Sequence, residues 1–169
     1  MHSNKYVLGF ICFLMIGMVG CKGAPSQRPD DFSLYSYWNT GALPPEYYYE
    51  IEIEINSDRS GNLTFQRGYE IEPGSRISYE FSVNEQEWND FYDWMKENDL
   101  FKNSWEDGSE ISEGGSGTLM KFQTEGVKYE IPSISMLAKN DRAIIAELQT
   151  RVNALVSEDV WNAVEVLKP

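Results

Sequence analysis

The chain has 169 residues, and its 14 Lys and Arg against 27 Asp and Glu give a formal net charge of −13. A protein this negative repels nucleic acid and anionic lipid headgroups, so we expect no nucleic-acid partner. The expected partners are instead cations, basic protein patches or neutral glycans. Five Trp, ten Tyr and eight Phe are enough to fill one hydrophobic core, which favours a single domain.

Residues 1–20 have the pattern of a signal peptide. A short segment containing Lys5 is followed by a 14-residue apolar run from Tyr6 to Val19. A membrane-spanning helix needs about 20 apolar residues, so this run fits a signal peptide better than the alternative, an uncleaved N-terminal helix. Cleavage before Cys21 would leave 13 basic and 27 acidic residues, a formal charge of −14.

The residues Met18-Val19-Gly20-Cys21 resemble the lipobox of bacterial lipoproteins, in which a small residue precedes an invariant Cys. Gly20 and Cys21 match the pattern, while Met18 replaces the usual Leu. The resemblance implies signal cleavage between Gly20 and Cys21 and lipidation of Cys21 by a diacylglycerol, usually with an acylated amino terminus. Two or more acyl chains, such as palmitate, anchor a protein stably. We therefore expect a lipid-anchored protein of the bacterial cell envelope, at the outer membrane if the organism is Gram-negative, because Lys22 is not Asp.

Cleavage of residues 1–20 would also remove the only histidine and one of the two cysteines of the chain. The single histidine is His2, and of the two cysteines only Cys21 would remain, consumed by the anchor. An intramolecular disulfide, a nucleophile paired with histidine and a His/Cys zinc site are then all excluded. Only carboxylate, Lys or Tyr chemistry is left, and we expect no catalytic residues and no cofactor.

The chain after the anchor divides into a tether and one domain. Residues 21–31 contain two Pro and mixed charge and predict a flexible tether ahead of a globular domain at 32–169. Residues 32–45 are rich in aromatic side chains without a clear period and end in Pro44-Pro45. We expect an irregular arm packed on the domain; the alternative is an aromatic platform for glycans.

Alternation of apolar and polar residues predicts five strands. In the first, residues 47–56, Ile51, Ile53 and Ile55 alternate with glutamates. Further strands are predicted at 63–66, 77–83, 118–124 and 127–131. The last two form a hairpin around a two-residue loop, Glu125-Gly126, with five predicted pairs: Thr124 with Val127, Gln123 with Lys128, Phe122 with Tyr129, Lys121 with Glu130, and Met120 with Ile131.

Three helices are expected. Asn84 is the predicted N-cap of the first, whose Trp88, Phe91, Tyr92 and Met95 form one apolar stripe. Asn140 and Ser157 are the predicted N-caps of the other two. The elements together predict an α+β fold of two layers, in which helices pack on one face of an antiparallel sheet of about five strands.

This layout resembles small, uncharacterised bacterial lipoproteins with a hairpin, helix, hairpin, helix order and a TG-x-x-PP-x-Y element ahead of the first strand. The resemblance covers residues 40–165, and the element is formed by Thr40, Gly41, Pro44, Pro45 and Tyr47. It implies no catalytic residues.

Four groups of residues are candidates for a site. Glu50, Glu52, Glu54 and Glu80 form a possible binding surface, although a solvated face is the simpler interpretation. Asn56, Asp58 and Ser60 begin a weak match to a calcium loop, but Arg67 stands where the twelfth residue must be Glu, so a plain turn fits better. The loop from Asp107 to Gly117 is a candidate by exposure, and Trp38, Trp105 and Trp161 are expected to pack rather than bind.

Two functions remain. The preferred hypothesis is a non-enzymatic, lipid-anchored module that binds an envelope protein or glycan. The alternative is a carboxylate-dependent enzyme acting on glycans, or an inhibitor of one, which requires two carboxylates to converge in a pocket.

Overall fold

The structure is a computed structural model that describes residues 27–70, 73–106, 108 and 116–169. Its strands are β1 (Ser33–Asn39), β2 (Tyr49–Ile55), β3 (Ser60–Arg67), β4 (Arg76–Ser82), β5 (Gly117–Thr124) and β6 (Val127–Ile131). Its helices are α1 (Glu85–Glu97), α2 (Lys139–Ala154) and α3 (Glu158–Glu165), with a short 3-10 helix, η1 (Ile134–Met136), before α2.

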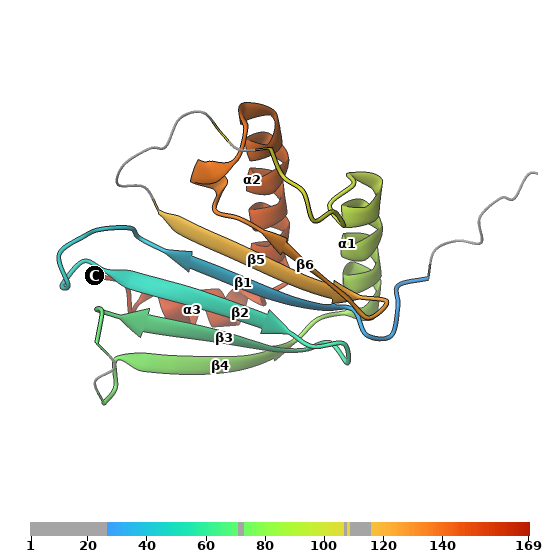
Figure 1. Ribbon diagram of the computed structural model, residues 1–169. Coiled ribbons are helices and arrows are strands. Elements are labelled where there is room, and N and C mark those ends of the chain that lie inside the picture. The colour runs from blue at the N-terminus through green and yellow to red at the C-terminus, as the bar shows by residue number, and fades with distance from the viewer. Residues whose placement is uncertain (1–26, 71–72, 107, 109–115) are drawn as a thin grey trace, which may run out of the picture.

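The described strands form one antiparallel sheet in the order β4-β3-β2-β1-β5-β6. All three helices lie on the same side of this sheet (Figure 1). The predicted α+β class with helices on one face is therefore confirmed, and the sheet has six strands where about five were expected.

The additional strand is β1, and the expectation of an irregular arm at residues 32–45 is wrong for its first half. Residues 33–39 pair with β2 on one side and β5 on the other. Leu34, Ser36 and Trp38 face the helices, and Ser36 is only 2% exposed. This buried serine interrupts the apolar alternation by which the other strands were predicted.

The hairpin of β5 and β6 has all five of the predicted residue pairs. Its loop residues Glu125 and Gly126 have φ angles of 52° and 73°, the left-handed conformation that tight two-residue hairpin turns require. Both of their backbone N–H groups donate to the Asp31 carboxylate, at 2.8 and 2.7 Å. These hydrogen bonds lower the pKa of Asp31 and connect the start of the domain to a turn far along the sequence.

Arg28, like Asp31, belongs to the expected tether but contacts the domain. Arg28 donates from Nε to Asn89 Oδ1 at 2.9 Å, and its guanidinium lies 5.9 Å from the centre of the Trp88 ring. The packed chain therefore extends to Arg28, four residues before the expected boundary at Phe32. Residues 21–26 lie outside the described part of the chain.

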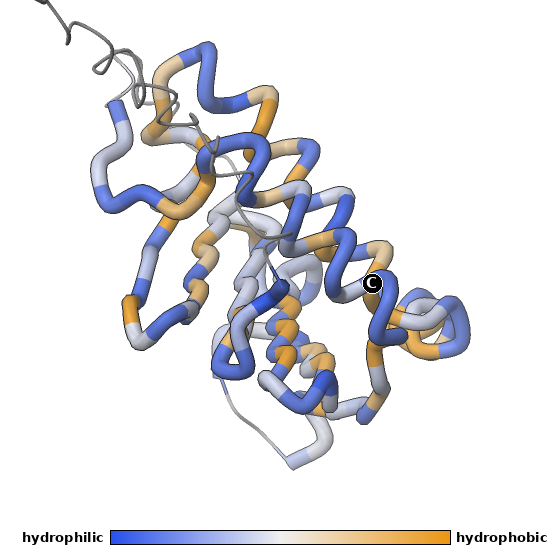
Figure 2. Tube along the Cα trace, turned by 90° about the vertical axis from the view of Figure 1, so that its right-hand side faces the viewer, coloured by the Kyte–Doolittle hydropathy of each residue, from blue (hydrophilic) through white to orange (hydrophobic). Residues whose placement is uncertain are grey.

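The core lies between the sheet and the helices. The apolar stripe of α1 is buried as predicted, and Phe32 packs on it with ring centres 4.5 Å from Trp88 and 4.9 Å from Tyr92. Asn84 caps α1 by accepting a hydrogen bond from the backbone N–H of Gln86. The hydrophobic and hydrophilic residues that alternate along the strands are visible in Figure 2.

The predicted caps of the later helices are only partly confirmed. The N-cap of α2 is Ala138, not Asn140, since the backbone N–H of Ala138 donates to the Glu106 carbonyl oxygen and fixes the chain two residues earlier. Ser157 is at the N-cap of α3, but its side chain makes no capping hydrogen bond.

Candidate functional site

The four candidate glutamates lie on the open face of the sheet, the face opposite the helices. Glu50, Glu52 and Glu54 follow one another along β2, about 7 Å apart by strand geometry. Glu80 lies on β4, with Asn62 of β3 directly between it and Glu54. The fold thus brings these residues to one face, but on two strands, β2 and β4, that are separated by β3.

Glu50 is held in a cluster of hydroxyl groups. Its Oε2 accepts hydrogen bonds from Tyr37 Oη at 2.7 Å and Tyr48 Oη at 2.9 Å, and Asn39 Nδ2 donates to Tyr37 Oη at 3.1 Å. Tyr48 is 7% exposed and stacks on Tyr69 with ring centres 4.0 Å apart. Burial is the main cause that raises the pKa values of Tyr37 and Tyr48. The Glu50 carboxylate is therefore occupied by its own neighbours.

Glu52 is also paired, because Arg76 of β4 donates to its Oε2 at 3.0 Å across the intervening strand β3. Glu54 and Glu80 differ, since both are exposed and make no hydrogen bond or ion pair with any described residue. Only these two of the four carboxylates are available to a ligand. No two of these four glutamates have carboxylates that converge in a pocket.

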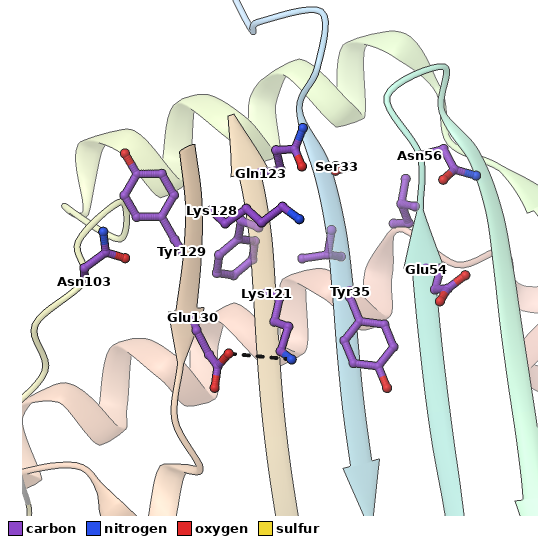
Figure 3. Close-up of a pocket in the computed structure, with 13 residues that line it drawn as sticks. Ser33, Tyr35, Glu54, Asn56, Asn103, Lys121, Gln123, Lys128, Tyr129 and Glu130 are labelled. Atoms are coloured by element: carbon purple, nitrogen blue, oxygen red, sulfur yellow. Dashed lines mark ion pairs between the residues drawn. The ribbon is translucent and has the colours of Figure 1, made fainter. Parts of the chain in front are cut away.

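A hollow of about 590 Å³ lies beside Glu54 on the open face. Figure 3 shows Glu54, Tyr35, Lys121 and Glu130 projecting into it from the adjacent strands β2, β1, β5 and β6. Lys121 and Glu130 form an ion pair with 3.6 Å between Nζ and Oε2. Burial, together with the glutamates of β2, raises the pKa of Tyr35 to about 12. Tyr35 is therefore a neutral hydroxyl at physiological pH.

Tyr35 and Tyr37 were missed by the sequence analysis because their strand was not predicted. The signal that would have found them is the alternation of Leu34, Ser36 and Trp38 with aromatic residues, once a buried serine is allowed on the core face. Register alone then places both tyrosines next to the glutamates of β2.

The weak calcium candidate lies in the turn between β2 and β3. The Asp58 carboxylate accepts hydrogen bonds from Ser60 N and Ser60 Oγ, at 2.9 and 2.6 Å, and these bonds lower its pKa. Asn56 Nδ2 also donates to Ser60 Oγ. From Ser60 onward the chain pairs as β3, so it does not wrap around an ion. The described residues contain no cluster of three or more His, Cys, Asp and Glu suited to a metal.

The remaining candidates are the three tryptophans, the loop from Asp107 to Gly117 and the residues of the anchor. Trp105 lies under Lys102, whose Nζ is 4.4 Å from the ring centre, whereas Trp38 and Trp161 are half-buried on the helical side of the sheet. Gly20, Cys21 and most of the loop from Asp107 to Gly117 lie outside the described residues. No helix in the described ranges is long and apolar enough to cross a membrane.

Comparison with known proteins leaves the family open. No family model matches the chain, and no curated protein matches its sequence.

The first prediction separates a structural glutamate from an available one. Glu50→Ala removes the shared acceptor of two hydroxyls and is expected to lower the free energy of unfolding by about 1–3 kcal/mol, because Tyr48 is left buried without it. Glu54→Ala is the matched control from the same strand and face and should cost less than about 0.5 kcal/mol. Urea denaturation measures both. Equal losses for the two variants would contradict the assignment.

Proposed function

We propose that the chain is a lipid-anchored protein of the bacterial cell envelope that acts as a non-enzymatic binding module. Its binding surface is the open face of the sheet around Tyr35, Glu54 and Glu80, and its partner is a basic patch on another envelope protein. The observation that carries the proposal is the hollow of about 590 Å³ on a sheet face that none of the described helices covers.

The charges on this face favour a basic partner. Glu54 and Glu80 are exposed, with Asn62 of β3 between them, and they have no counter-ion among the described residues. Of the two lysines beside the hollow, Lys121 is balanced by Glu130, and Lys128 brings one positive charge against the two exposed glutamates. A partner that brings Lys or Arg to this surface gains complementary potential and is steered by the net negative charge of the whole chain.

The carboxylate-dependent enzyme finds no matching support. The separation of about 7 Å between successive glutamates of β2 falls within the range of carboxyl separations in glycosidases. A catalytic acid and base must in addition direct both carboxyl groups at one bond of the substrate. Glu50 is held by two hydroxyls and Glu52 by Arg76.

The anchor is tested by Cys21→Ser. Because the serine lacks the sulfur that carries the diacylglycerol, we expect this variant to be released from membranes and to keep its signal peptide. Cell fractionation and the mass of the purified protein measure both effects. A variant that stays fully membrane-bound would contradict the anchor.

The binding surface is tested by crosslinking in cells. A photo-crosslinking residue replaces Tyr35, and mass spectrometry identifies the proteins attached to it. The double variant Glu54→Gln with Glu80→Gln is expected to reduce the main adduct about fivefold, since each exposed charge contributes modestly. Glu87→Gln with Glu97→Gln removes two exposed charges from α1 and should leave the yield unchanged. Equal yields from the two double variants would contradict the proposal.

A further inference from the structure

The strand β4 ends the sheet and has one unpaired side. It pairs with β3, and in Figure 1 it is the lowest strand, with no described segment beyond it. An open edge of this kind accepts another strand unless proline, lysine or a bulge blocks it. β4 has no proline, no lysine and an uninterrupted register with β3. It is therefore able to pair with a further strand.

The edge at β6 is less open. β6 has five residues where β4 has seven. Phe101 and Asn103, from the chain after α1, lie beside Tyr129 of β6, and the ring centres of Phe101 and Tyr129 are 5.6 Å apart (Figure 3). The longer and less covered of the two edges is thus β4.

The backbone groups of alternate β4 residues point away from the sheet. Just before β4, Arg67 N donates to Ser75 O at 2.9 Å, and just after it, Val83 N donates to the backbone oxygen of the residue opposite at 3.0 Å. Because the two kinds of position alternate along an antiparallel pair, the odd-numbered residues of β4 bond to β3. The outward N–H and C=O groups have no partner in the described chain and belong to Arg76, Ser78, Glu80 and Ser82.

The charges on β4 select one register for pairing with a second copy of itself. Arg76 and Glu80 lie four residues apart on the open face, with Ser78 midway. If two copies pair antiparallel around Ser78, Arg76 of each copy is opposite Glu80 of the other, and these outward residues form the hydrogen-bonded pairs. Centring the pair on Ile77 or Tyr79 instead places a serine opposite Arg76. The Ser78 register therefore makes two opposite-charge pairs that its neighbours lack.

Both charged side chains are available for these pairs. Glu80 is exposed and makes no hydrogen bond or ion pair with any described residue. Arg76 donates to Glu52 through Nη2 at 3.0 Å, which leaves the donors on Nε and Nη1 for a second carboxylate. A second copy thus supplies the counter-ion that Glu80 lacks within its own chain.

The apolar side of β4 fits the same register. Ile77 and Tyr79 face the helical side, opposite the buried Phe65 and Leu63 of β3, yet both remain half-buried. In a pair centred on Ser78, Ile77 of each copy is opposite Tyr79 of the other. These are non-hydrogen-bonded positions, where side chains come closest, so pairing removes apolar surface of both residues from water.

We propose that two copies of the chain pair through β4 in the register centred on Ser78 and join their sheets into one. The negative charge of each chain opposes association, but salt at physiological concentration screens charges beyond about 8 Å. In the pair, Glu80 contacts the second copy, while Tyr35 and Glu54 stay on the open face, away from this edge. The pairing does not rest on the proposed function, because the purified chain alone tests it.

The experiment is native mass spectrometry of the full chain in detergent, under reducing conditions and at physiological ionic strength. We expect dimers of the unmodified chain at tens of micromolar concentration. Glu80→Arg and Arg76→Glu each place like charges opposite one another at two positions, and each should weaken the dimer about tenfold or more. Glu97→Arg makes the same change of charge on α1 and should leave the dimer unchanged.

Mixing the two edge variants tests the register itself. A copy with Arg76→Glu has two negative residues at the contacts and a copy with Glu80→Arg has two positive ones, so a mixed pair has opposite charges at both. We expect the mixture to form heterodimers, identified by their mass, which a loss of folding in either variant would prevent. The proposal is overturned by a monomeric unmodified chain, by dimers that persist in either edge variant or are lost in Glu97→Arg, or by a mixture without heterodimers.

Discussion

The pairing of β1 with two neighbours is the constraint on which this fold depends. On one side of β1 is the meander β2-β3-β4, and on the other side is the hairpin β5-β6. No other described strand pairs with both groups. Phe32, directly before β1, is fully buried against α1, and Asp31 binds the hairpin turn. A stretch of nine residues near the start of the described chain therefore unites strands that are distant in sequence.

The sheet separates two kinds of chemistry. The helical face holds the core and, next to it, the half-buried rings of Trp38 and Trp161. The open face holds hydroxyls and carboxylates, of which Glu50 and Glu52 maintain the sheet while Glu54 and Glu80 remain exposed. In the anchored state that we propose, the tether leads directly into β1, so the strand that unites the sheet also carries the connection to the membrane.

Much of this architecture was predictable because alternation and turn chemistry act locally. The β5-β6 register followed from Glu125-Gly126 and one opposite-charge pair, since a shift by one residue would turn every side chain to the other face. β1 was not predictable in the same way, because Ser36 is buried by long-range packing. The sequence pattern placed the four glutamates on one face correctly. It did not show which of them are already bonded, because Tyr37, Tyr48 and Arg76 contact Glu50 and Glu52 only once the strands pair.

Native-state hydrogen exchange tests the role of β1 most directly. The amides of Ser36 in β1, Ile53 in β2 and Met120 in β5 lie in adjacent strands of the sheet. If β1 unites the two groups of strands, all three amides exchange only through global unfolding and give one common free energy of opening. If the amide of Met120 in β5 opens at a clearly lower free energy than the amide of Ile53 in β2, the two groups of strands are independent and the account is contradicted.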